Sequence, residues 1–280
     1  MKKKLIIHLG YPKTGSTFMQ NYIFHNCENY LNIKNKILFD DIFFTINSLS
    51  KKIFKKKLNF YKQKISEINF KKQNIISNEN LSAIFQGNYF DFRYKIKCLY
   101  ELFNHTGLEV SFLLIKRKID EHLRSIFVEY NYNLLHFSKK NFSMDYFITS
   151  TINNNSNQLI KKNLNTHYIN SEIKKKFKNS KILILDMDNL FKKRVNYKKI
   201  SYLLAMDSIK LENIIKNKKS VNKSTFREGN WIFKFHLVRH ISNFFQNLIN
   251  FNADLFFLKN NFYKLYLLIK FKLFMFFKKF

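Results

Sequence analysis

The chain has 280 residues, of which 46% are hydrophobic, and its formal net charge is +31. This hydrophobic content excludes general disorder, and the length suits one sizeable domain with an appendage. Because the positive charge is spread over the whole chain together with many Asn, Ile and Phe residues, we interpret most of it as a compositional bias. It is therefore no indication of a specific nucleic-acid-binding patch. Two cysteines, Cys27 and Cys98, are too few for a disulfide framework and lack metal-binding spacing.

The chain begins "MKKKLIIHLGYP", a basic head followed by apolar residues, as in a secretory signal peptide. The apolar run is shorter than the roughly 7–15 residues that such a peptide needs. We therefore interpret residues 3–10 as a buried strand that ends at Gly10, and we expect a cytoplasmic protein. No stretch approaches the ~18 uncharged apolar residues typical of a membrane span.

The next elements follow from hydrophobic periodicity. From Ser16 onward, apolar residues at 18, 19, 22 and 23 have the spacing of one helix face. The lysine-rich segment 42–70 is typical of one or two surface helices. Further strands are expected at 73–77 and 108–117, the latter followed by a helical pattern to about Leu134. Residues 180–191 are interpreted as a strand that continues into a helix.

This alternation of strands and helices predicts an α/β fold, a three-layer sandwich around a mostly parallel sheet. In such sheets, ligands bind at the carboxyl ends of the strands. The boundaries that we expect are an α/β domain over 1–228 and a helical appendage over 229–280. Within the appendage, 231–249 has the pattern of an amphipathic helix and 263–280 is aromatic, aliphatic and lysine-rich. The segment 230–280 could contact an anionic membrane peripherally, at the inner face, or could pack as a cap on the core or a dimer contact.

The stretch "LGYPKTGSTF" (9–18) contains the only proline and two of the five glycines of the chain. A strand, a loop and a helix N-terminus in succession present unpaired backbone N–H groups to an anion. Gly15 lets the backbone approach a bulky oxyanion, Pro12 fixes the entry of the loop, and Lys13 supplies a positive charge. Three hydroxyl groups complete the set of donors: Thr14, Ser16 and Thr17. The alternative is an ordinary strand–helix turn with an N-cap.

The order of residues argues against a nucleoside-triphosphate-binding Walker loop. That loop carries its lysine directly after its second glycine, whereas Lys13 precedes Gly15. "YPKTGSTFMQ" instead resembles the 5′-phosphosulfate-binding loop of sulfotransferases that use 3′-phosphoadenylyl sulfate (PAPS). The resemblance implies a P-loop-like sulfotransferase fold for residues 3–228. It also implies that the 5′-phosphate and sulfuryl group are held by Lys13, Thr14, Gly15, Ser16 and Thr17.

A second motif, "LLIKRKIDEHLRSIF", resembles the 3′-phosphate site of the same family. In that site an arginine ends a strand and a serine follows eight positions later on a helix, which are the relative positions of Arg117 and Ser125. Arginine suits phosphate because its planar guanidinium donates two parallel hydrogen bonds. "KKSVNKSTFREG" (218–229) resembles a segment that closes over the 3′-phosphate and makes Arg227 a candidate ligand. The alternatives are a surface arginine and an ordinary helix-face serine.

The family chemistry implied is sulfuryl transfer from PAPS as co-substrate, with no metal. Lys13 would stabilise the charge that develops on the bridging oxygen. Glu79, after the second strand, is the candidate general base, although it could equally be a favourable first-turn glutamate of a helix. His8 is interpreted as a core or pocket residue, and His105 and Glu129 are weaker alternatives for the base.

The acceptor implied is a hydroxyl group, with a carbohydrate of a surface polysaccharide or lipid-linked glycan as the leading choice. Two other classes of function stay open. A P-loop kinase or NTPase would need a Walker lysine and a Mg²⁺-binding carboxylate, neither of which we can place. A non-enzymatic basic protein that binds membrane or nucleic acid is compatible with the charge, but no recognised nucleic-acid motif is present.

Overall fold

The structure is a computed structural model. It describes residues 2–11, 13–82, 91–135, 144–153, 162, 164–191, 197–217, 226–227 and 230–231. Its centre is a sheet of four parallel strands in the order β2-β1-β3-β4. The strands are β1 (Lys4–Gly10), β2 (Gln73–Asn78), β3 (Glu109–Lys116) and β4 (Lys181–Asp186). All four expected strands are confirmed, and with them the α/β class and the parallel sheet.

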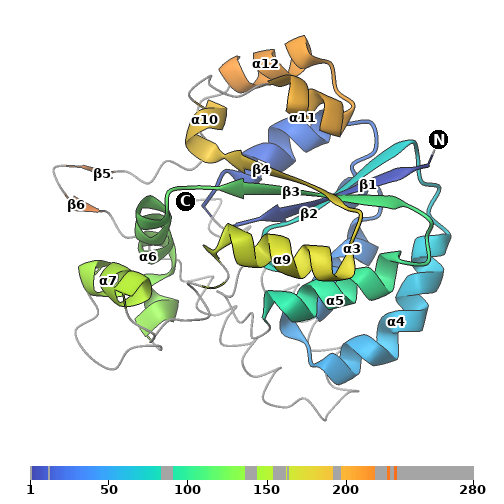
Figure 1. Cartoon of the computed structure of the whole chain (residues 1–280), viewed down its shortest axis with the longest axis horizontal. Coiled ribbons are helices and arrows are strands. Elements are labelled where there is room, and N and C mark those ends of the chain that lie inside the picture. The colour runs from blue at the N-terminus through green and yellow to red at the C-terminus, as the bar shows by residue number, and fades with distance from the viewer. Residues whose placement is uncertain are drawn as a thin grey trace, which may run out of the picture.

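Helices cover both faces of this sheet (Figure 1). Successive side chains of a strand point to opposite faces, so Leu5, Ile7 and Leu9 of β1 enter one hydrophobic cluster and Ile6 enters the other. The first cluster is completed by α3 (Lys36–Ser48), α4 (Lys51–Ser66), α5 (Phe92–Phe103) and α9 (Thr166–Lys176). The second includes the helical run after β1 together with α10 (Met187–Phe191), α11 (Tyr197–Leu204) and α12 (Ser208–Asn217).

The helix expected from Ser16 onward is helical but not uniformly α-helical. It consists of α1 (Ser16–Phe18), a π-helical turn η1 (Met19–Ile23) and a 3₁₀ turn η2 (Phe24–Asn26). Gln20 in the π turn donates from Nε2 to Ser77 Oγ at 2.9 Å, and this bond to β2 stabilises the widened turn. Isolated π turns occur frequently at functional sites.

Four further helical elements are described. They are α2 (Leu31–Lys34), η3 (Glu79–Leu81), α6 (Ile119–Leu135) and α7 (Met144–Asn153). The pair β5 (Phe226–Arg227) and β6 (Asn230–Trp231) is antiparallel. Apart from β6, the predicted appendage 229–280 lies outside the described residues. None of the helices in the described ranges is long and apolar enough to cross a membrane.

Candidate functional site

The candidate site lies at the carboxyl edge of the sheet, next to β1. At this point the order of the strands changes direction. β2 pairs with one side of β1 and β3 with the other. In doubly wound sheets of this order, ligands bind in the crevice at the switch point between β1 and β3. Gly10, the last residue of β1, pairs with Ile115 of β3. The loop after Gly10 and the residues after Lys116 therefore start from neighbouring strand ends.

The loop after β1 is held together by its own hydroxyl groups. Thr14 Oγ1 and Ser16 Oγ both donate to the carbonyl oxygen of Tyr11, at 2.8 and 3.1 Å. Both side chains are buried, while Thr17 is half-buried. The sequence predicts all three hydroxyls as donors to an anion; in this structure those of Thr14 and Ser16 form hydrogen bonds within the loop.

Two loop residues have left-handed backbone conformations. Gly15 has a φ of 84° and precedes α1, and Lys13 has a φ of 67°. This conformation costs a non-glycine residue roughly 1–2 kcal/mol. A lysine that keeps it is an outlier of the kind that clusters at ligand-binding sites.

The candidate base is adjacent to the start of this loop. A Cβ atom added to Gly10 would overlap Ser16 Oγ and lie 3.1 Å from Glu79 Cα. Ser82 fixes the same contact, because its Oγ donates to the carbonyl oxygen of Gly10 at 2.7 Å. The η3 turn, which begins at Glu79, therefore packs directly on the end of β1, and Glu79 is half-buried there.

Arg117 follows β3 and forms an ion pair with the nearby carboxylate of Glu121. Its Nε donates to Glu121 Oε2 at 3.2 Å, and both side chains are partly exposed to solvent. Ser125 lies one further helical turn along α6 and is 8% exposed. Glu121 and Ser125 thus lie one turn apart on α6, and Arg117 precedes this helix by two residues.

The loop and α6 are joined through aromatic packing. The buried rings of Tyr11 and His122 meet edge to face, with their centroids 5.5 Å apart. The carbonyl oxygen of Tyr11 also accepts from Thr14 and Ser16, so this residue connects the loop to the helix that carries Ser125. The loop after β1 and the helix α6 are therefore in direct contact.

Other predicted residues lie elsewhere. His105 is exposed just after α5, near the amino end of β3 and therefore at the opposite edge of the sheet. For Glu129 and Arg227 the structure describes only the backbone, in α6 and β5. His8 is fully buried in β1, with Nδ1 2.7 Å from Ser77 Oγ and its ring against Phe24. His8 is therefore a core residue in this structure.

Burial lowers the pKa of His8 from 6.5 to about 3, so the folded protein holds this imidazole neutral. The unfolded chain takes up a proton as the pH falls below 6.5, and the folded chain does not until about 3. The free energy of unfolding is therefore highest above pH 6.5, and it decreases as the pH falls from 6.5 towards 3. At pH 5 the loss is about 2 kcal/mol.

We expect His8→Gln to reduce the difference in unfolding free energy between pH 7 and pH 5 by about this amount. Glutamine retains a polar group for Ser77 but does not titrate. Urea denaturation of both proteins at the two pH values measures the difference. An identical pH dependence in the two proteins would assign the acid sensitivity to other groups.

Comparison of the chain with protein-family models, curated proteins and solved structures gives no match in any of the three. Among the described residues, no group of three or more His, Cys, Asp or Glu side chains is placed to hold a metal ion. The functional assignment therefore depends on the residues at the carboxyl edge of the sheet.

Sequence reasoning missed three residues of this region. Glu121 could have been found as the four-residue partner of Arg117. Lys95 falls among Phe92, Ile96 and Leu99 on the apolar side of α5, and a lysine in such a position is itself a signal. No sequence pattern indicated the ring contact of His122, because it joins elements that are far apart in the chain.

Proposed function

We propose that the chain is a sulfotransferase that moves a sulfuryl group from PAPS to a hydroxyl acceptor. The observation that carries the proposal is the convergence of three predicted groups on three neighbouring strand ends. The Lys13 loop follows β1, Arg117 follows β3, and Glu79 follows β2. The finer assignment to the P-loop-like sulfotransferase fold belongs to the same proposal, since the strand order and the position of the loop are compatible with it.

In the proposed reaction, an acceptor oxygen attacks the sulfur of PAPS in line with the departing phosphate oxygen. The new S–O bond forms as the S–O bond to the nucleotide phosphate breaks, and the acceptor proton passes to a base. Lys13 stabilises the charge on the departing oxygen, and the backbone N–H groups near Gly15 contact the 5′-phosphate. A loop already braced through Tyr11 binds the anion with little reorganisation.

Glu79 is the proposed base because its turn packs on Gly10, beside the proposed sulfuryl site. A carboxylate in this place would accept the acceptor proton during the attack. The acceptor class that we favour is a carbohydrate hydroxyl of a surface polysaccharide or lipid-linked glycan. The resemblance to the sulfotransferase family supports this choice.

Arg117 and Ser125 are the proposed ligands of the 3′-phosphate. Glu121 is already a partner of Arg117, so the 3′-phosphate has to compete with this carboxylate. The two negative groups repel each other. Nucleotide binding therefore includes the release of the Arg117 guanidinium from Glu121, or its sharing between the two.

The test is isothermal calorimetry of the full chain with adenosine 3′,5′-bisphosphate, AMP, ATP and duplex DNA. We expect the bisphosphate to bind more tightly than AMP, because only it reaches both strand ends. Preference for ATP with Mg²⁺ would favour a kinase or NTPase. Preference for DNA, with a steep loss of affinity in salt, would favour a basic nucleic-acid-binding protein.

Arg117→Ala should weaken binding of the bisphosphate by about 10–100-fold, the value of a charge-assisted hydrogen bond, and should leave AMP binding almost unchanged. Arg124→Ala is the matched control, because Arg124 lies on α6, the helix that follows Arg117, and contacts Asp145 at 3.8 Å. Glu121→Gln should bind the bisphosphate as tightly as wild type or more tightly. Equal losses for the bisphosphate and AMP in Arg117→Ala would disprove the 3′-phosphate assignment.

A further inference from the structure

Lys95 on α5 has a buried amine that contacts the turn carrying the candidate base, Glu79. Its side chain has no solvent exposure, and its Nζ donates to the carbonyl oxygen of Asn80 at 2.7 Å. Lysine is almost never fully buried unless its amine has partners. Asn80 is the residue directly after Glu79, so this bond fixes the backbone of the η3 turn.

The same turn is held from two other directions. Asn78 Oδ1 accepts from the backbone N of Asn80 at 3.0 Å, and Ser82 Oγ donates to the carbonyl oxygen of Gly10. The Lys95 bond is the contact from α5. With these bonds in place, the turn has little freedom to move relative to the end of β1.

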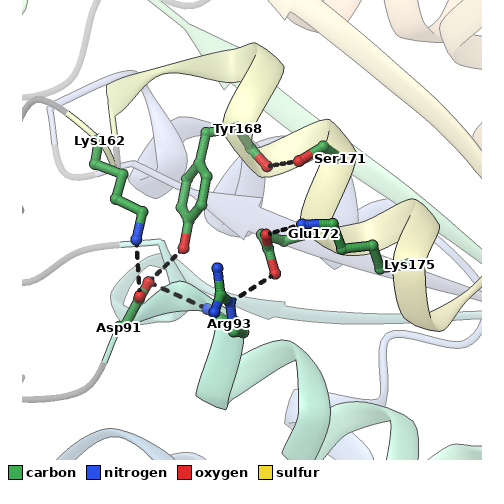
Figure 2. A network of polar contacts seen from close by, with 7 residues as sticks. All are labelled: Asp91, Arg93, Lys162, Tyr168, Ser171, Glu172 and Lys175. Carbon is green, nitrogen blue, oxygen red and sulfur yellow. Dashed lines mark hydrogen bonds and ion pairs between the residues drawn. The ribbon is translucent and has the colours of Figure 1, made fainter.

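The helix that carries Lys95 is itself fixed at its beginning (Figure 2). Asp91 caps α5 and accepts from Tyr168 OH at 2.6 Å and from Lys162 Nζ at 3.1 Å. Two residues further along, Arg93 Nε donates to Glu172 at 3.1 Å. These contacts join the first turn of α5 to α9 and to Lys162. They therefore fix the position of the helix that carries Lys95.

Burial lowers the pKa of Lys95 to about 7, an effect that the negative charge of Asp91 partly opposes. Near neutral pH the amine is therefore divided between its charged and neutral forms. Both forms carry N–H donors, so the bond to the Asn80 carbonyl persists in either one. The positional effect of Lys95 does not require a fixed charge.

We propose that Lys95 is a positioning residue that holds the Glu79 turn against the Lys13 loop. The proposal rests on the proposed sulfotransferase function, because it assigns Lys95 an effect on turnover through Glu79. Lys95 itself does not touch a substrate, since it is fully buried. A displacement of a reacting group by about 1 Å can reduce a rate by about 10²-fold.

The test is Lys95→Met, which keeps the apolar stem and removes the amine. We expect kcat for transfer from PAPS to fall by about 10–100-fold, with KM for PAPS and affinity for the bisphosphate within about twofold of wild type. Lys97→Met is the matched control, because Lys97 lies on the same helix with a side chain 55% exposed, and we expect no change. A raised KM with unchanged kcat, or equal losses in both variants, would overturn the proposal.

Asn78→Ala is a second variant, which loosens the same turn without placing a new group in the core. It should also lower kcat without raising KM, and an unchanged kcat would contradict a positioning role for the turn.

Hydrogen exchange at residues 79–82 separates this inference from the proposed function. If wild type neither binds the bisphosphate nor transfers sulfate, the function is wrong, and faster exchange in Lys95→Met would still support its hold on the turn. Unchanged exchange would overturn that hold.

Discussion

Lys13→Ala is expected to lower kcat/KM for transfer from PAPS by about 10²–10³-fold, the value of one preorganised charge-stabilising donor. Unfolding free energy should change by less than about 1 kcal/mol, because Lys13 is half-buried in a loop and alanine has the same steric difficulty at a φ of 67°. Turnover assays and urea denaturation measure the two quantities.

Lys13→Gly makes the same experiment sharper. Glycine adopts a positive φ without steric cost, so this variant should be as stable as wild type or more stable by up to about 1 kcal/mol. Transfer should nevertheless fall as far as in Lys13→Ala. Near-wild-type transfer in either variant would remove the loop from the proposed site. Loss of folding in both would show that Lys13 is structural.

Gly10→Ala is expected to disrupt the site from within the fold. The added methyl group would overlap Ser16 Oγ and lie 3.1 Å from Glu79 Cα, which is backbone and has little room to move. We expect a loss of about 1–3 kcal/mol in unfolding free energy, as for an overpacked core. Because the loop or the Glu79 turn must shift, kcat should fall at least about tenfold.

Gly107→Ala is the control for Gly10→Ala. Gly107 has a φ of 69°, but a Cβ there would meet nothing within 4 Å. It should lose about 1–2 kcal/mol from backbone strain alone, before β3 and far from the site, with kcat unchanged. Comparable losses of kcat in the two variants would mean that activity follows global stability. A fully active Gly10→Ala would show that the close approach is unimportant.

Local sequence patterns were sufficient for the elements of the sheet. The strands around Ile6, Ile75, Leu113 and Leu183 are short apolar runs, and the structure places strands in each of them. Such runs are readable because burial on both faces of a parallel sheet requires nearly continuous apolar residues. The same patterns could not show that the helix after Ser16 contains a π turn, because that turn is stabilised by Gln20 through a contact with β2.

The proximity of Glu79 to Gly10 could not be predicted from the sequence, although both residues lie at the ends of predicted strands. It depends on the pairing of β1 with β2, two strands separated by about sixty residues of chain. The inward turn of Thr14 and Ser16 was equally unpredictable, because a hydroxyl can donate to a ligand or to its own loop with similar geometry. Only the folded loop decides between these partners.

The α/β class, the strand positions and the residues of the loop after Gly10 can all be read from the chain alone, since they depend on neighbours within a few positions. The strand order β2-β1-β3-β4, the contact of Glu79 with the start of that loop, and the bond of Lys95 to the Asn80 carbonyl emerge only in the folded molecule. They do so because strand order and side-chain burial are fixed by packing between distant segments. Apolar periodicity states which side of an element is buried, but not which element covers it.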